Sequence, residues 1–467
     1  MRQLFRVFIP GNLVGLIVSE IVLVFLCYLT GAWMVAAFLN PFMVLSVFLF
    51  VEGGLIQILV VTACLTMGMY FQDLYANIRV KSVTFLVQQV CLVIGLAFLV
   101  QALFAYVRRP EWSLPRWAMI FGSILALIVI PSWRVLYARV LLKVFGYQRV
   151  LFLGAAAVSQ EIAAHLVARP EIGLSVLGYI DDVDAVELPG GKMIGRIGDL
   201  TSIAETLKPD LVVVGMTERR RELPMTDMLR LRLAGVRFEE AAVTFEAAFG
   251  RVSTRQMQPS RLVFSDQLGP GKSSLFWHSV YSLPIAAAVL VIFSPVILVT
   301  AVLVALTSRG PVFHRQRRVG LNGTVFTLYK FRSMYADAEA RSGPVWAKKD
   351  DPRITPVGRW IRRFRIDELP QLLNVLRAEM ALVGPRPERP EFVAGLAEQI
   401  PYYVYRHCVR PGITGWAQIN YKYGDTLEDA IIKLEYDLYY IKNLAVSLDF
   451  YIIFHTLKVM LFSETAQ

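Results

Sequence analysis

Two adjacent acids, Asp367 and Glu368, lie in the stretch FRIDELPQLLNVLRAEMALVGPRPE (residues 364–388), close to several arginines. Neighbouring carboxylates beside arginines are ionised and can together hold a hard divalent cation such as Mg²⁺. An aspartate can also attack phosphorus to form an aspartyl-phosphate type intermediate, for which a metal and nearby cations must offset charge on the transferred group. The alternative is structural, because acids favour the positive end of a helix dipole. On spacing alone, the structural interpretation is the commoner one.

Two cations precede this stretch in HRQRRVGLNGTVFTLYKFRSM (residues 314–334). Asn322-Gly323 between two extended runs predicts a β-hairpin. Lys330 and Arg332 are two residues apart on the second run, so on a strand they share one face and suit a diphosphate. A solvated basic strand would show the same pattern, and the residues alone do not separate these interpretations.

An arginine between two prolines follows the acids. Pro385 and Pro387 fix the backbone on each side of Arg386, so its guanidinium is presented to a phosphate or a base edge at little ordering cost. Further along, RPGITGWAQINY (residues 410–421) predicts a second rigid turn that begins with Arg410. These residues are the candidate substrate-binding groups.

The elements that hold these residues belong to a membrane-like chain. Of its 467 residues, 55% are hydrophobic and 18% charged, and the net charge of +11 suits anionic partners such as lipid headgroups and phosphates. Four cysteines are too few for a disulfide scaffold. Four apolar runs are long enough to cross a bilayer, at about residues 12–33, 43–70, 83–107 and 117–135. Lys and Arg concentrate on the segments that face inward when the N-terminus is inside, which places both ends of this group in the cytoplasm.

Two acids, Glu20 and Glu52, lie inside these runs. An intramembrane carboxylate can mark a transport or proton path. It can also make a helix-to-helix hydrogen bond or lie near the interface. No series of acids and histidines accompanies the two glutamates, which favours the second explanation.

A fifth apolar segment, at about residues 277–307, has Ser294-Pro295 in its middle. Proline removes a backbone donor and disturbs the preceding turn, while serine can satisfy a freed backbone group. The segment could therefore enter the membrane and return on the same side, or cross it as a kinked helix. The choice decides on which side the C-terminal part lies.

The chain between residues 148 and 265 alternates short apolar strands with helical stretches. This alternation predicts a parallel, Rossmann-like sheet, and it is seen in the stretches RVLFLGAAAVSQEIAAHL, LSVLGYIDD and PDLVVVGM. The dinucleotide fingerprint needs three glycines. Only Gly154 is present, and alanines follow it, so we expect a structural or regulatory domain.

The C-terminal part resembles the bacterial sugar transferase family of monotopic phosphoglycosyl transferases. The resemblance is carried by YKFRSM, IDELPQLLNVLRAEMALVGPRPE, RPGITGWAQINY and EYDLYYIKNLAVSLDFYIIFHTLKVML, in order over about residues 270–465. The whole chain is similar to the long polyprenyl-phosphate type, and WAQINYKYGDTLEDA to the exopolysaccharide subgroup associated with the PEP-CTERM system. Ala378 and Ala381 stand where the family usually has glycine and serine.

The resemblance implies a membrane protein of mixed class in three parts. These are a four-helix transmembrane bundle (1–146), a degenerate Rossmann-like domain (147–268) and an α/β monotopic catalytic domain (269–467) with a re-entrant helix broken at Ser294-Pro295. It implies a multi-pass protein of the bacterial inner membrane, in contact with membrane lipids, with its catalytic domain in the cytoplasm. The extra domains are compatible with a homodimer.

The implied reaction transfers a sugar 1-phosphate from a UDP-sugar to undecaprenyl phosphate, releases UMP and initiates exopolysaccharide synthesis. Asp367 would be the nucleophile that forms a covalent phosphosugar intermediate, and Glu368 would help to hold Mg²⁺ at the acid pair. Arg386 would contact the nucleotide, and Lys330 and Arg332 the phosphates. The sequence does not name the sugar.

Two other classes of protein would leave different signals in the sequence. A membrane-anchored nucleotide-sugar modifying enzyme needs a glycine-rich fingerprint and usually a Tyr-x-x-x-Lys pair, and none of the 19 tyrosines has a lysine four residues later. A non-catalytic polysaccharide assembly component would tolerate alanine at Asp367, whereas the transferase would lose turnover. The positive charge lies near apolar segments and phosphate motifs, which argues against a nucleic-acid partner.

Overall fold

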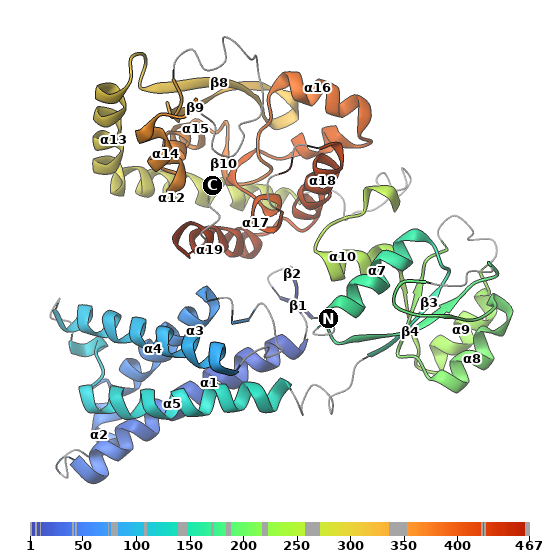
Figure 1. Cartoon of the computed structure of the whole chain (residues 1–467), viewed down its shortest axis with the longest axis horizontal. Coiled ribbons are helices and arrows are strands. Elements are labelled where there is room, and N and C mark those ends of the chain that lie inside the picture. The colour runs from blue at the N-terminus through green and yellow to red at the C-terminus, as the bar shows by residue number, and fades with distance from the viewer. Residues whose placement is uncertain are drawn as a thin grey trace. The chain divides into compact units, whose positions relative to one another are not determined.

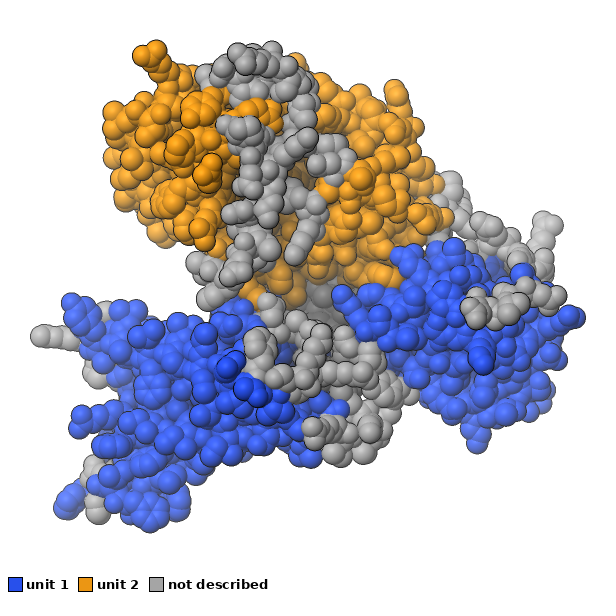
Figure 2. Space-filling view, in the orientation of Figure 1, with its two compact units in different colours: residues 1–2, 8–241 blue, residues 3–7, 242–467 orange. Residues whose placement is uncertain are grey.

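The computed structural model describes residues 2–4, 7–9, 11–39, 42, 44–72, 74–75, 83–106, 110–138, 148–169, 172–183, 188–216, 223–256, 271–335, 353–421, 424 and 426–462. The chain forms two compact units (Figure 2). The first comprises residues 1–2 and 8–241, and the second residues 3–7 and 242–467. The predicted domain boundaries at 146/147 and 268/269 stay predictions.

Long apolar helices make up the first part of unit 1 (Figure 1). They are α1 (Gly11–Met34), continued by the π-helix η1 (Val35–Leu39), then α2 (Leu45–Phe50), α3 (Gly54–Phe71), α4 (Val83–Tyr106) and α5 (Arg116–Leu136). A continuous buried core joins these helices, with Tyr28, Ile58, Val90 and Met119 among its members. Five helices in the described residues are apolar and long enough to span a bilayer, four of them in this group. The chain is therefore a membrane protein.

The second apolar run, predicted over 43–70 as one span, consists of two helices. Between α2 and α3 the chain turns at Val51–Gly53, where Gly53 has a φ of 77°. Glycine reaches this left-handed region at low cost, and Gly53 allows the chain to change direction before α3 begins. Glu52, placed inside a span by the sequence, is an exposed residue of this turn.

Glu20 makes an ion pair inside the helix group. Its carboxylate accepts hydrogen bonds from Arg134 Nε at 2.6 Å and Nη2 at 2.9 Å, which joins α1 to α5. Arg134 also donates to the carbonyl of Leu74, and its guanidinium lies 4.9 Å from the ring centroid of Tyr75. The predicted helix-to-helix hydrogen bond is thus confirmed for Glu20.

The second part of unit 1 is a five-stranded parallel sheet in the order β5-β4-β3-β6-β7. Its strands are β3 (Gln148–Leu153), β4 (Leu174–Ile180), β5 (Met193–Gly195), β6 (Leu211–Val214) and β7 (Arg237–Glu240), and its helices α7 (Ala157–Ala168), α8 (Leu200–Leu207) and α9 (Met225–Leu233). Parallel strands with helical crossovers are the predicted Rossmann-like arrangement, which is confirmed.

The turn after β3 has a carboxylate where a dinucleotide domain binds pyrophosphate. Gly154 has a φ of 99°, and the next amide, Ala155 N, donates to Asp181 Oδ2 at 2.8 Å. Asp181 lies directly after β4. The protein's own acid therefore accepts an amide hydrogen bond near the start of α7, as an anionic ligand would.

Unit 2 contains the motifs of the C-terminal part. Its helices are α10 (Ala241–Phe249), α12 (Lys272–Ile292), α13 (Ser294–Thr307), α14 (Pro356–Arg363), α15 (Leu372–Leu376), α16 (Pro390–Gln399), α17 (Trp416–Asn420), α18 (Leu427–Lys442) and α19 (Val446–Phe462), with the 3-10 helices η7 (Thr254–Gln256), η9 (Ile366–Gln371) and η10 (Tyr403–Cys408). Its strands are the antiparallel pair β8 (Phe313–Val319) and β9 (Val325–Phe331) and the parallel pair β10 (Ala381–Val383) and β11 (Gly412–Thr414). The predicted hairpin is confirmed, with Asn322 at a φ of 51° in its turn.

The fifth apolar segment breaks at the predicted residues. α12 ends at Ile292 and α13 begins at Ser294, with Pro295 in its first turn. Ser294 Oγ donates to the carbonyl of Val291 at 2.7 Å, and the two helices leave the break in different directions (Figure 1). Pro295 lacks the amide that would donate to the carbonyl of Val291, which favours a break here, although α12 itself continues through Pro284.

Residues 242–256, which we call the entry segment, pack on α18. The Glu435 carboxylate accepts hydrogen bonds from Thr254 N at 2.8 Å and Thr254 Oγ1 at 3.0 Å, and pairs with Arg251 at 3.1 Å. Trp416 Nε1 donates to the carbonyl of Gly250 at 2.7 Å. The entry segment is therefore an integral part of unit 2.

Candidate active site

A cavity of about 330 Å³ lies in unit 2, and its lining contains more cations than acids. The lining Lys and Arg residues are Arg318, Lys330, Arg353, Arg362, Arg365, Arg386, Arg389, Arg406 and Lys433, and the lining acids are Asp367, Glu388 and Asp437. They come from β8, β9, α14, η9, η10, α18 and the loops between them, so segments more than a hundred residues apart in the sequence meet here. Such an excess of positive charge suits a ligand with several phosphate charges.

Both acids of the pair lie in η9 and are buried, with 8% of Asp367 and 7% of Glu368 exposed. Arg365, the residue before η9, has a φ of 52°. A non-glycine residue in this left-handed region is strained, and such strain is often found at functional sites. The conformation turns the chain sharply between α14 and the acids.

Glu368 is held by three cations. Its Oε1 accepts from Lys330 Nζ and from Arg386 Nη2, each at 3.1 Å, and its Oε2 lies 3.5 Å from Arg365 Nη1. Burial alone would raise the pKa of Glu368, but Lys330, Arg386 and Arg365 together outweigh it and hold the pKa below its ordinary value. Glu368 is thus a fixed anion that orients the surrounding cations.

Asp367 differs from its neighbour. Its side chain lines the cavity, and no hydrogen bond or ion pair from any residue in the described part of the chain reaches its carboxylate. Burial, followed by the charge of Glu368, raises the pKa of Asp367, although Lys330, Arg362 and Arg365 oppose the shift. Asp367 therefore offers its oxygen lone pairs to a ligand in a site surrounded by positive charge.

The structure does not bring Lys330 and Arg332 together. β9 ends at Phe331, so the alternation of faces stops before Arg332. Arg332 is buried away from the cavity and donates from Nη2 to the carbonyl of Ser308 at 2.6 Å, beyond the end of α13. Carbonyls at a helix C-terminus attract a guanidinium, and this contact replaces the shared strand face that we predicted.

The Pro385-Arg386-Pro387 turn is fixed through its carbonyls. Gly412 N donates to the carbonyl of Pro385 at 3.0 Å, and Arg318 Nη1 to that of Pro387 at 2.9 Å. The guanidinium of Arg386 lines the cavity and donates to Glu368, and its contact with a nucleotide stays a prediction.

Arg406 and Asp437 are site residues that the sequence did not single out. Arg406 donates to the carbonyl of Arg386 at 3.0 Å, to Tyr403 Oη at 2.7 Å and to Asp437 Oδ2 at 2.8 Å. Only 6% of Arg406 and 1% of Asp437 is exposed. The pair supports the turn that carries Arg386, and no local pattern announces a contact between residues 31 positions apart.

Arg410 lies outside the residues that line the cavity. Its Nη1 donates to Ser279 Oγ on α12 at 2.8 Å. The rigid turn predicted at this arginine therefore joins β11 to the apolar helix.

The acid pair is compatible with Mg²⁺ through Asp367. Among the described residues, no group of three His, Cys, Asp or Glu side chains could hold a metal alone. Mg²⁺ commonly binds one or two carboxylates and completes its shell with water and substrate phosphates. Asp367 has oxygens available, whereas Glu368 already accepts from three cations, so Asp367 is the better protein ligand of the two.

Two family models match the sequence. The model described as bacterial sugar transferase matches residues 274–463, which contain the cavity, and the model described as CoA-binding domain matches residues 70–231.

Curated relatives of known description are also similar. One is the UDP-N-acetylgalactosamine-undecaprenyl-phosphate N-acetylgalactosaminephosphotransferase of Aeromonas hydrophila, 50% identical over 38% of this chain and 42% of the relative. Another is the undecaprenyl-phosphate glucose phosphotransferase of Komagataeibacter xylinus, 35% identical over 68% of this chain and 60% of the relative. A third is the UDP-glucose:undecaprenyl-phosphate glucose-1-phosphate transferase of Xanthomonas campestris pv. campestris, 32% identical over 68% of both chains. The match thus spans less than two thirds of the first two relatives.

Proposed function

Because the chain belongs to the bacterial sugar transferase family, we propose that it transfers a sugar 1-phosphate from a UDP-sugar to undecaprenyl phosphate and releases UMP. One observation carries the proposal: Asp367 presents a carboxylate, with no hydrogen-bond or ion-pair partner among the described residues, to a cavity rich in cations. The names of the relatives support the same donor and acceptor. The role in initiating exopolysaccharide synthesis rests on the sequence resemblance, and the homodimer remains a prediction.

The chemistry follows from the two acids. An Asp367 oxygen attacks the phosphorus that bears the sugar, the bond from this phosphorus to the bridging oxygen breaks, and UMP leaves with that oxygen. A phosphate oxygen of undecaprenyl phosphate then attacks the same phosphorus, and the bond to Asp367 breaks. The product is a sugar linked to the lipid by a diphosphate, and the carboxylate is restored.

The cations position the phosphates and offset their charge. Lys330 and Arg386 contact Glu368 and line the same cavity as Asp367, so they can bind the diphosphate there. Mg²⁺ bound at Asp367 would neutralise phosphate charge further. Glu368 keeps the cations in place and is a positioning residue.

The membrane arrangement is also a proposal. We infer that α1, α3, α4 and α5 cross the bilayer as a four-helix bundle, and that α12 and α13 form one re-entrant unit that enters and leaves on the same face. The excess of Lys and Arg on the inward segments supports a cytoplasmic N-terminus, and with the re-entrant unit this puts unit 2 on the cytoplasmic face of the inner membrane in our proposal. Unit 2 would then face the compartment that contains UDP-sugars.

The decisive experiment measures UMP release with and without acceptor. Purified protein in nanodiscs is mixed with Mg²⁺ and UDP-glucose, UDP-N-acetylgalactosamine or another UDP-sugar. Without undecaprenyl phosphate, the wild type should release one UMP per active site and gain the mass of a sugar phosphate. Asp367→Asn should show neither, whereas Asp227→Asn, in α9 of unit 1, should behave like the wild type.

Two results would contradict the proposal. UMP release that strictly requires the acceptor would exclude the covalent intermediate. Absence of UMP from every donor, with acceptor present, would exclude the transferase activity itself.

A further inference from the structure

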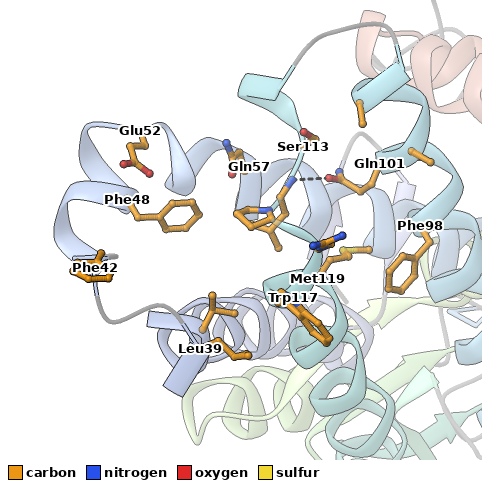
Figure 3. A pocket seen from close by; sticks show the side chains of 16 residues that line it. Leu39, Phe42, Phe48, Glu52, Gln57, Phe98, Gln101, Ser113, Trp117 and Met119 are labelled. Atoms are coloured by element: carbon orange, nitrogen blue, oxygen red, sulfur yellow. Dashed lines mark hydrogen bonds between the residues drawn. The ribbon is translucent and has the colours of Figure 1, made fainter. Parts of the chain in front are cut away.

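The helix group of unit 1 contains a second, larger cavity of about 1030 Å³ (Figure 3). Ligand sites in proteins commonly measure about 300 to 1,000 Å³, so this cavity is large enough for a lipid headgroup and part of its chains. It is lined by η1, α2, α3, α4 and the first turn of α5. None of these elements contributes to the cation-lined cavity of unit 2.

Most of the lining is apolar. The apolar side chains around the cavity come from four helices (Figure 3). They are Leu39 of η1, Phe48 of α2, Phe98 of α4, and Trp117 and Met119 at the start of α5. Side chains of this type favour hydrocarbon, and tryptophan is typical of the membrane interface. A cavity in a group of membrane helices with such walls is suited to an amphiphile.

One buried amide in the lining lacks a partner. Only 6% of Gln101 is exposed; its Oε1 accepts from Leu114 N at 2.8 Å, and its Nε2 makes no hydrogen bond to any described residue. A buried donor without a partner is unfavourable, and an acceptor oxygen of a ligand would satisfy it.

The described lining residues carry one cation and one anion, Arg116 and Glu52. Both are exposed, and neither has an ion pair in the described part of the chain. Their formal charges cancel, so a headgroup with one phosphate and one ammonium matches them. Glu52 disfavours a diphosphate or another headgroup with two negative charges.

We propose that this cavity binds one glycerophospholipid with a zwitterionic headgroup. Its phosphate faces Gln101 and Arg116, its ammonium faces Glu52, and its chains contact the apolar wall. The proposal is independent of the transferase reaction, because it concerns unit 1 and is tested by lipid binding.

The test uses the full chain in vesicles of equal parts phosphatidylethanolamine and phosphatidylglycerol, followed by extraction into mild detergent and native mass spectrometry. We expect one phosphatidylethanolamine per chain in the wild type. Ala102→Phe fills the cavity from α4 and should remove the lipid. Gln101→Leu should lower the fraction of chains that retain the lipid by a factor of about 2 to 10, which is the effect on affinity expected from the loss of one hydrogen bond. Gln88→Leu is the matched control on an exposed position of α4 and should change nothing.

Glu52→Gln tests the headgroup. It leaves Arg116 as the charge in the described lining and should shift retention toward phosphatidylglycerol. The unfolding temperature of each variant is measured in parallel, and only variants within about 2 °C of the wild type are compared.

Three outcomes would overturn the proposal. They are a wild type that retains no lipid, equal retention of both lipids, and lipid retention by Ala102→Phe at the level of the wild type. Displacement of phosphatidylethanolamine by an equal concentration of undecaprenyl phosphate would also overturn it, because the site would then belong to the carrier.

Discussion

The buried pair Arg406–Asp437 permits a quantitative test of unit 2. Arg406 cannot lose its proton, whereas the Asp437 carboxylate can gain one. Removing either partner therefore has unequal consequences. Asp437→Leu leaves a permanent buried cation, whose remaining acceptors are Tyr403 Oη and the carbonyl of Arg386. Arg406→Met leaves a buried carboxyl that can become neutral.

The expected costs follow from this difference. An uncompensated buried charge costs about 3–5 kcal/mol, so Asp437→Leu should lower the unfolding temperature by about 6 to 20 °C for a unit of this size. Arg406→Met should cost less at low pH. The double variant should be less destabilised than Asp437→Leu alone, because no buried charge remains.

The pH dependence distinguishes the two single variants. Burial already raises the pKa of Asp437 in the presence of Arg406, and without this guanidinium the folded pKa should rise further. A folded pKa above the unfolded value gives stability that is complete at low pH and declines as the pH rises. The stability of Arg406→Met should fall by up to about 1.4 kcal/mol per pH unit relative to the wild type. Asp437→Leu should show no such added slope.

Unfolding is followed by intrinsic fluorescence of the purified protein between pH 6 and 8. Glu428→Gln is the control, since its exposed ion pair with Arg255 on the same unit contributes at most about 1 kcal/mol. If both single variants lost the same amount of stability, and this loss did not change with pH, the reasoning would be refuted. The reasoning would also be refuted if the double variant lost as much stability as the two single variants together.

Three further predictions concern other parts of the chain. If α12 and α13 are re-entrant, cysteines placed at Ser273 and Arg309 in a background lacking the native cysteines should both react from the cytoplasmic face with a membrane-impermeant thiol reagent, and opposite labelling would show a spanning helix. Burial, followed by a neighbouring guanidinium, lowers the pKa of His407 to about 4. His407 therefore contributes stability to unit 2 that is complete above pH ~6.5 and is lost as the pH falls toward ~4, and His407→Gln should reduce that loss, as measured by the unfolding temperature. Glu435→Ala removes the acceptor of the entry segment and should accelerate tryptic cleavage after Arg251, as followed by mass spectrometry; an unchanged rate would mean that other contacts hold the segment.

Features with a local cause were predictable from the sequence. The hairpin at Asn322-Gly323 and the break at Ser294-Pro295 depend on the backbone preferences of a few adjacent residues. The parallel sheet depends on short apolar runs separated by helical ones. The position of Arg386 follows from its two prolines.

Features that depend on distant partners were not predictable. Arg332 is directed to the carbonyl of Ser308, and Arg410 to Ser279, because those groups lie within reach only in the folded chain. The different environments of Asp367 and Glu368 likewise arise from cations on three other segments. Adjacent acids look equivalent in a sequence, and only tertiary structure distinguishes them.

The ion pair between α1 and α5 has a consequence for biosynthesis. Glu20 is made 114 residues before Arg134, which at roughly 5–20 residues per second is an interval of about 6 to 20 seconds. During that time α1 would expose an unpaired carboxylate to lipid, at a cost of a few kcal/mol. We expect α1 to stay beside the insertion machinery until α5 emerges. α5, the last helix of the group to be synthesised, thus supplies the cation that pairs with Glu20 on α1, the first.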